Sequence, residues 1–230
     1  MIRTFDIVAK LTNEILGSWI NEPNEMWEKM IGKKSADAAR MAEEEKMLPA
    51  ADLIEKGQTV FPRDTDGMPI ILAYQLKGFF KAALNDLILI LGDDGHKIET
   101  GRMKKKGTEA VALTTYAAAG VVDRFVHVTP DRIRFEGLPA DFNADKLERC
   151  IRPLRAKTMQ GDRVSVSCSE SLPAGITFRF QVKTDLNFLG DHVAAMIKRG
   201  EYVGLNQWRT SGKGSFIAEV TETTPKVEAA

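Results

Sequence analysis

Polar and apolar residues alternate in several stretches of the chain, which is the pattern of β-strands that bury one face. We expect single strands in four of these stretches, at residues 5–11, 121–128, 132–137 and 215–222. A turn at residues 129–131 joins the second and third of them. The segments 162–170 and 175–184 alternate most clearly, and the turn sequence Leu-Pro-Ala-Gly lies between them. We therefore predict that these two segments form a β-hairpin.

Apolar residues recur at helical spacing in three other segments. In residues 71–91, Leu76, Phe80 and Leu84 fall near one face, which predicts a helix packed on a core. Gly78 inside this helix suggests that another chain segment passes close to it. We expect a second amphipathic helix over residues 25–47 and a third over 191–200, with Gly200 near its end.

The order of these elements predicts the fold. Without its insertions the chain reads β-α-β-β-α-β, which is the ferredoxin-like pattern. We therefore expect an α+β protein with a modified ferredoxin-like (RRM-like) core and large insertions. The expected organisation is a single domain over residues 1–222, with insertions at about 20–60 and 92–150. The polar tail at 223–230 is expected to be disordered.

Composition and charge narrow the function. The 230 residues carry 32 basic and 32 acidic side chains, so any nucleic-acid surface has to be local. Cys150 and Cys168 form neither a disulfide framework nor a zinc spacing, and no Walker loop is present. We expect no metal and no cofactor. Neither a spanning apolar run nor a secretory signal is found, so we expect a cytoplasmic protein without a membrane contact.

The segment GLNQWRTSGKGSF, residues 204–216, is the most suggestive local sequence. Gly212 and Gly214, with Gly204, allow close backbone approach, and exposed N–H groups there form an anion-binding concavity. Arg209 and Lys213 add positive charge for phosphate, and Trp208 is able to stack on a base. The alternative is a flexible connection with Trp208 in the core.

Other basic residues extend this candidate surface. Lys77 and Lys81 are four residues apart, so they share a helix face and are able to hold one phosphate; the alternative is a solvated lysine pair. Arg102, Lys104 and Lys105 lie in a polar loop that is either simply solvated or closes over an RNA backbone. A second basic cluster, whose contacts the sequence does not place, consists of Arg149, Arg152, Arg155 and Lys157.

Four segments resemble the RAMP proteins of CRISPR effector complexes, and they occur in the family's order. They are RDTDGMPIILAYQLKGFFKAAL, LPAGITFRFQV, HVAAMIKRG and GLNQWRTSGKGSF. They resemble the lead into the first helix, the penultimate hairpin, the second helix and the glycine-rich loop, and they cover about half of the chain. Leu72-Ala73-Tyr74-Gln75 stands where the family has Pro-Gly-Ser-Ser. The likeness is greatest to the backbone subunit that lines the guide RNA in class 1, type III-like complexes.

The resemblance implies an RNA-binding subunit of a ribonucleoprotein filament. Its expected partners are single-stranded guide RNA, copies of itself and other effector-complex subunits. Members that cleave target RNA place an aspartate a few residues before an Arg-Asp or Lys-Asp pair, which is Arg63-Asp64 here, so we expect it six residues before Asp64. Gln58 stands at that position, and an amide cannot transfer protons near neutral pH. We therefore expect no catalytic residue, and we expect Asp64 and Asp66 to shape the turn before Pro69.

Two other functions remain open. A stand-alone or phage-borne relative that acts through protein–protein interaction is consistent with the neutral net charge. An endoribonuclease would use the acidic residues of this loop region, Asp52, Glu55, Asp64 and Asp66.

Overall fold

The structure is a computed structural model, and it describes residues 2–20, 58–103, 110–139, 142–158 and 161–223. The chain divides into two compact units, which are treated separately below. The first unit contains residues 1–15, 62–144 and 173–230, and the second contains 16–61 and 145–172. The predicted helix at 25–47 and nearly all of the predicted tail lie outside the described residues.

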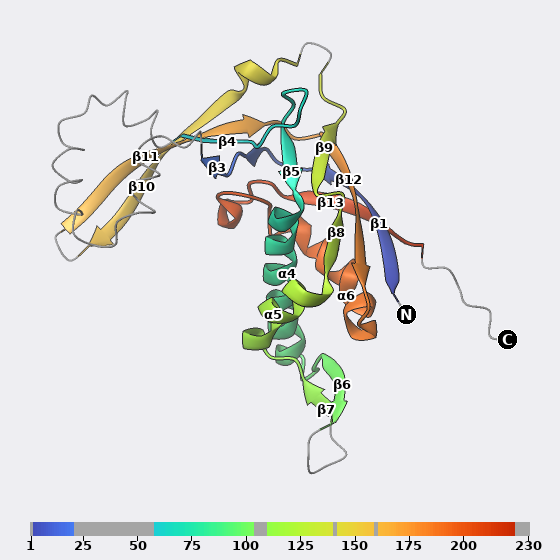
Figure 1. Cartoon of the computed structure of the whole chain (residues 1–230). Coiled ribbons are helices and arrows are strands. Elements are labelled where there is room, and N and C mark those ends of the chain that lie inside the picture. The colour runs from blue at the N-terminus through green and yellow to red at the C-terminus, as the bar shows by residue number, and fades with distance from the viewer. Residues whose placement is uncertain (1, 21–57, 104–109, 140–141, 159–160, 224–230) are drawn as a thin grey trace, which may run out of the picture. The chain divides into compact units, whose positions relative to one another are not determined.

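An antiparallel sheet, whose strands are not neighbours in chain order, forms the centre of the first unit (Figure 1). Its strands are β1 (Arg3–Leu11), β5 (Ile70–Leu72), β8 (His127–Thr129), β9 (Arg132–Glu136), β12 (Thr177–Thr184) and β13 (Phe216–Glu222). Their spatial order is β13-β1-β12-β9-β5, and β8 also pairs with β12. We count β8 and β9 as one interrupted strand, leave out β5, and number the four remaining strands in chain order as β1, β8/β9, β12 and β13. Their spatial order is then 4-1-3-2. This is the strand order of a ferredoxin-like fold, so the predicted fold class is confirmed.

Helices cover one face of this sheet. The helix α4 (Ala73–Asp93) contacts β5 and β8, and α6 (Asn187–Lys198) contacts β1, β12 and β13. Alternate residues of the strands point into this layer, and the rings of Phe79 and Phe178 each contact Phe216, with centroids 5.1 and 5.9 Å apart. Burial of these aromatic side chains is the main force that holds the helices on the sheet.

The opposite face of the two central strands is polar. Asp6 and Lys10 of β1 and Arg179 and Lys183 of β12 occupy it, and Arg179 pairs with Glu136 at 2.9 Å. An RRM stacks bases on aromatic residues of this face. Neither strand carries an aromatic residue there, since Phe5, Phe178 and Phe180 are buried on the helix side. The core is therefore ferredoxin-like in topology without the stacking residues of an RRM.

The second unit consists of strands. The long strands β10 (Glu148–Thr158) and β11 (Gly161–Leu172) form a hairpin, and β4 (Gln58–Val60) pairs with β11 in parallel. The short strand β3 (Trp19–Ile20) pairs with β4, and the chain passes from one unit to the other within the short strand β2 (Ile15–Leu16) and the 3-10 helix η1 (Ala144–Lys146). Residues 58–60 of the acidic loop region therefore form a strand, β4.

The predicted hairpin of 162–170 with 175–184 is wrong. The first of these strands, β11, pairs along its length with β10, whereas the second, β12, pairs with β1. Alternation identifies a strand and its buried face, but it carries little information about the partner strand. The turn at Pro173–Gly175 instead links the two units.

The expected strand at 121–128 is mostly a helix, α5 (Thr115–Phe125). Thr114 caps it by accepting a hydrogen bond from the Ala117 N–H at 3.3 Å, and Ala118 and Val122, four residues apart, are buried. Only the last residues of the predicted strand belong to β8. The polar stretch after α4 forms a small ribbon of β6 (Glu99–Met103) and β7 (Ala110–Ala112).

The remaining predicted elements of the first unit are confirmed. The strands β1, β9 and β13 and the helices α4 and α6 lie where the sequence places them. Among the described residues, no helix is long and apolar enough to cross a membrane.

Candidate nucleic-acid interface

The glycine-rich loop closes on itself. It leaves α6 through η2 (Arg199–Glu201), contains η3 (Arg209–Ser211) and ends at β13. A Cβ atom on Gly204 would lie 1.8 Å from the Lys213 carbonyl oxygen, and one on Gly214 would lie 2.4 Å from the Leu205 carbonyl oxygen. The Leu205 N–H donates to the Gly214 carbonyl at 3.0 Å. These two glycines therefore allow the two ends of the loop to pack together.

The tip of the loop is held in an unusual backbone conformation. Trp208 has φ +57° and Gly212 has φ +77°, so both residues that flank η3 are left-handed. A bulky residue with positive φ is rare and is kept only where its surroundings fix it. Trp208 is 39% exposed, so it is not the core residue of the alternative interpretation.

Lys213 and Arg209 differ in their surroundings. The Lys213 ammonium pairs with the Glu14 carboxylate and lies 5.9 Å from the centroid of the Trp208 ring. The Gly214 N–H also donates to the Glu14 carbonyl, at 2.7 Å. Lys213 thus fastens the loop to the end of β1. Arg209 is exposed and has no ionic partner among the residues that the structure describes, so it is the cation that the loop presents to solvent.

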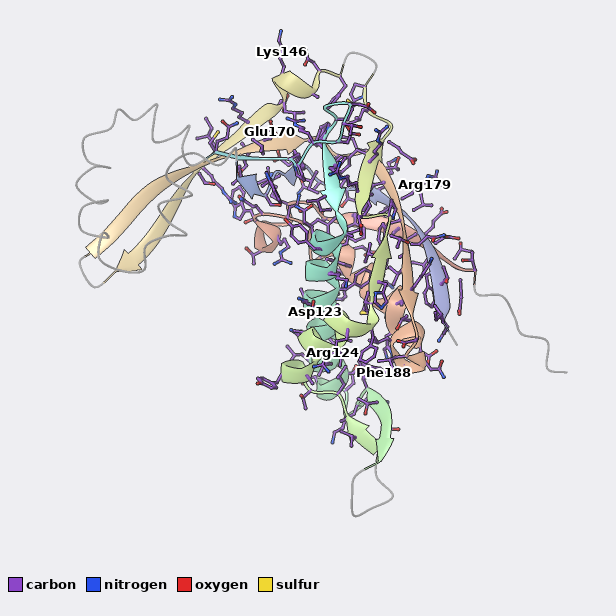
Figure 2. The ribbon with its side chains drawn as sticks, in the orientation of Figure 1. Asp123, Arg124, Lys146, Glu170, Arg179 and Phe188 are labelled. Carbon is purple, nitrogen blue, oxygen red and sulfur yellow. The ribbon has the colours of Figure 1, made fainter. Side chains whose placement is uncertain are left out.

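Lys77 and Lys81 share a helix face as predicted, but both contact Asp123 at the end of α5. The Lys81 ammonium lies 2.7 Å from the Asp123 carboxylate, and the Lys77 ammonium donates to the Asp123 carbonyl at 3.3 Å. Figure 2 labels Asp123 where α5 lies against α4. The space that a phosphate would occupy between the two lysines is therefore taken by the protein's own oxygen atoms.

The adjoining surface of α4 is open. No atom of the described residues lies within 4 Å of a Cβ built on Gly78, so the expected close approach of another segment is not seen there. Tyr74, one helical turn earlier, is 57% exposed.

The other predicted basic residues are described only in part. Arg102 belongs to β6, and Lys104 and Lys105 lie outside the described residues. Arg149 is exposed on β10 and Arg152 is partly buried, and both belong to the second unit.

The acidic segment forms a turn. One oxygen of the Asp64 carboxylate accepts hydrogen bonds from the N–H groups of Asp66 and Met68, both at 2.9 Å, and Arg134 pairs with Asp64 and Asp66 at 2.7 and 2.5 Å. Burial alone raises the pKa of Asp64, but these hydrogen bonds and the charges of Arg134 and Arg132 lower it overall. The expectation that Asp64 and Asp66 shape the turn is confirmed.

Gln58 is a strand residue and only 6% exposed. It lies in β4, opposite Cys168 of β11. Asp52 and Glu55 lie outside the described residues. No group of three or more potential metal ligands is present in the part of the chain that the structure describes.

Neither protein-family models nor curated proteins match the chain. Among solved structures it is similar to a chain of the type III-B Cmr-beta complex bound to cognate target RNA, with 12% identity and a TM-score of 0.45. That match covers 96% of this chain and 60% of the other, so this chain spans less than two thirds of its length. A chain of a type IV-B CRISPR complex matches with 11% identity and a TM-score of 0.48, covering 99% and 93%. At these identities the likeness concerns the arrangement of the elements alone.

Proposed function

We propose that this chain is a non-catalytic subunit of a CRISPR-type ribonucleoprotein filament, in which neighbouring copies bind the backbone of a single-stranded guide RNA. Two features support the proposal together. The four segments that resemble RAMP proteins occur in the family's order. Three of them fall on the matching elements of a ferredoxin-like core, namely α4, α6 and the loop before β13, whereas the fourth contains the strand β12 without the expected hairpin. The observation that carries it is the tip of the glycine loop, with Trp208 and Arg209.

This tip has the chemistry of a sequence-independent RNA contact. Arg209 offers an exposed guanidinium for a phosphate, and the Trp208 ring is partly exposed beside it in sequence. Stacking of one base on such a ring contributes about 1–3 kcal/mol. Because the base of the loop is closed by backbone packing and by the Lys213–Glu14 pair, little of the loop has to be ordered on binding.

The open surface of α4 at Gly78 and Tyr74 offers room for the same strand. A helix glycine costs about 1 kcal/mol relative to alanine. No described segment uses the space above Gly78, so we assign that space to an RNA backbone.

The test measures binding of unrelated single-stranded RNAs by fluorescence anisotropy over a range of salt concentrations. We expect similar affinities for all of them and a steep decrease with salt. Arg209→Gln should reduce the salt slope by about 0.7, the share of one phosphate contact, and Trp208→Leu should weaken binding about tenfold.

Arg179→Gln is the matched control. It removes the same charge from an exposed arginine of the first unit, on the sheet face away from the helices, where Figure 2 labels it. Its affinity should equal that of the unaltered protein. The absence of any binding at low salt contradicts the proposal. If Arg179→Gln and Arg209→Gln lose equal amounts of RNA affinity, the RNA is assigned to the sheet face instead of the loop.

A further inference from the structure

A pocket of about 620 Å³ lies in the first unit, remote in sequence from the glycine loop. Its walls come from α5, the β6–β7 ribbon and the start of α6, and Figure 2 labels Arg124 and Phe188 beside one another there. The volume is in the range of about 300–1,000 Å³ that is usual for ligand sites. In Figure 1 the ribbon lies beyond the C-terminal end of α4, whereas the glycine loop lies beside its N-terminal half.

One face of α5 forms the floor of this Arg124 pocket. Ala117, Gly120, Val121 and Arg124 recur at helical spacing and all line it. A Cβ atom on Gly120 would have only the Arg124 side chain within 4 Å among the described residues, at 3.9 Å. Glycine in a helix costs about 0.5–1 kcal/mol relative to alanine. Because no described segment fills the space, the protein's own packing does not explain this glycine.

The side chains of the walls leave two exposed polar groups for an occupant to bind, those of Arg124 and Tyr116. The Thr100 hydroxyl donates to the Val111 carbonyl at 2.9 Å, and the Thr114 hydroxyl caps α5. Arg124 is exposed and has no ionic partner in the described part of the chain. The remaining wall is mostly apolar and includes Leu186 and Phe188. A nucleobase would bury several polar edge atoms here without partners, which is costly.

We propose that the Arg124 pocket is a docking site for an acidic segment of a partner protein. An apolar side chain of that segment fills the space over Gly120, and a neighbouring carboxylate pairs with Arg124. Charge complementarity to the exposed guanidinium selects an anionic occupant, and the mostly apolar wall favours an acidic peptide segment over RNA. Tyr116 is 97% exposed and lines the pocket, and tyrosine and arginine are the residue types that dominate binding energy at protein interfaces. This site goes beyond the proposed RNA binding and does not depend on it.

The test is a selection from a random peptide display library on the whole protein, followed by affinity measurements with synthetic peptides. Enriched peptides should combine a large apolar residue with Asp or Glu. Gly120→Leu fills the space with a good helix former and should reduce peptide affinity at least tenfold. Arg124→Gln should reduce it about two- to fivefold, as is usual for an exposed ion pair. A peptide with Asn or Gln in place of its acid should bind the unaltered protein as weakly as the original peptide binds Arg124→Gln.

RNA affinity of the same variants separates this proposal from the previous one. Circular dichroism confirms that each variant is folded, and both variants should bind single-stranded RNA as the unaltered protein does. The docking proposal is overturned if enriched peptides lack an acid, bind Gly120→Leu equally, or do not appear. The docking proposal is also overturned if Gly120→Leu abolishes RNA binding, since the occupant of the pocket is then RNA. If Gly120→Leu removes self-association of the protein and no peptide binds, the occupant is a second copy of the chain, and the proposal is overturned as well.

Discussion

At the scale of single residues, Gly214 fixes the closure of the glycine loop. It has φ +69°, and a Cβ atom there would lie 2.4 Å from a backbone oxygen. Gly67 has a similar φ of +77° with no described atom within 4 Å, so it is a matched control. We expect Gly67→Ala to cost about 1 kcal/mol through backbone strain alone. Gly214→Ala should cost about 1–3 kcal/mol more, because the backbone has to move. Urea unfolding of both variants measures the difference, and equal costs would show that the loop ends are not tightly packed.

Asp64 makes the folded state sensitive to acid. Its pKa is lowered in the folded protein, so its contribution to stability is full above the ordinary carboxyl pKa of about 3.9. The contribution is lost as the pH falls through the lower, folded value. Thermal unfolding is measured between about pH 2 and pH 7, roughly two units below and three units above 4. The unaltered protein should show a steeper loss of stability below about pH 4 than Asp64→Asn shows. Parallel curves for the two proteins would contradict the role of Asp64 in the turn.

Gln58→Asp tests the absence of catalysis. The change introduces the acid expected in the target-cleaving RAMP proteins that the sequence resembles, but at a position that is 6% exposed and within a strand. We expect the variant to lose roughly 3 kcal/mol of stability, because a carboxyl at this buried position is removed from water. Neither form should cleave RNA paired to a bound guide, with or without magnesium. Regularly spaced products from the unaltered protein, analysed on a sequencing gel, would favour the endoribonuclease alternative.

At the scale of elements, Asp123 connects α5 to α4. Its carboxylate pairs with Lys81, and the two side chains are 52% and 34% exposed. A double-mutant cycle with Asp123→Asn and Lys81→Met should give a coupling of about 0.2–1 kcal/mol, since solvent screens the pair. In Asp123→Asn, Lys81 loses its fixed anion, whereas Lys77 keeps its hydrogen bond to the backbone carbonyl of residue 123. RNA affinity at low salt should therefore rise through Lys81, and an unchanged affinity would place Lys81 outside the RNA surface.

The sequence predicted elements better than it predicted their partners. One face is buried in each of the amphipathic helices α4 and α6 and in each of the alternating strands β1 and β13. The hydrophobic pattern of the sequence therefore predicts the type and position of these elements. The partner of β11 could not, because alternation is the same whether a strand pairs with β10 or with β12. The sequence predicted a strand where most of α5 lies. The alternating valines favour a strand, and this pattern received more weight than the run of alanines and the threonine cap, which favour a helix.

The candidate site was predictable as a segment but not as a geometry. Trp208 and Arg209 could be named from composition, since a glycine-rich basic loop before a strand is visible in the sequence. The pairing of Lys213 with Glu14, and of Lys81 with Asp123, joins residues far apart in the chain. Such pairs depend on the folded arrangement, so local reasoning assigned both lysines to phosphate.

At the scale of the whole molecule, the proposed filament makes a prediction about assembly. Head-to-tail contacts between identical copies do not close into a dimer, so a long RNA should produce particles larger than two copies. Size-exclusion chromatography with light scattering, with and without a long single-stranded RNA, measures this directly. An RNA too short to span two copies is the control and should leave one copy per strand. A single copy on the long RNA would contradict the filament.

The pairing of β1 with β13 also bears on how the protein is made. This ladder joins Leu11 to Phe216, about 200 positions later, and Phe216 closes the aromatic core. At about 5–20 residues per second, a ribosome needs roughly 10–40 s to synthesise the intervening chain. During translation the edge of β1 that pairs with β13 has no partner for this time, and the edge that pairs with β12 has none until residue 184 is made, so the nascent strand is exposed to misassociation.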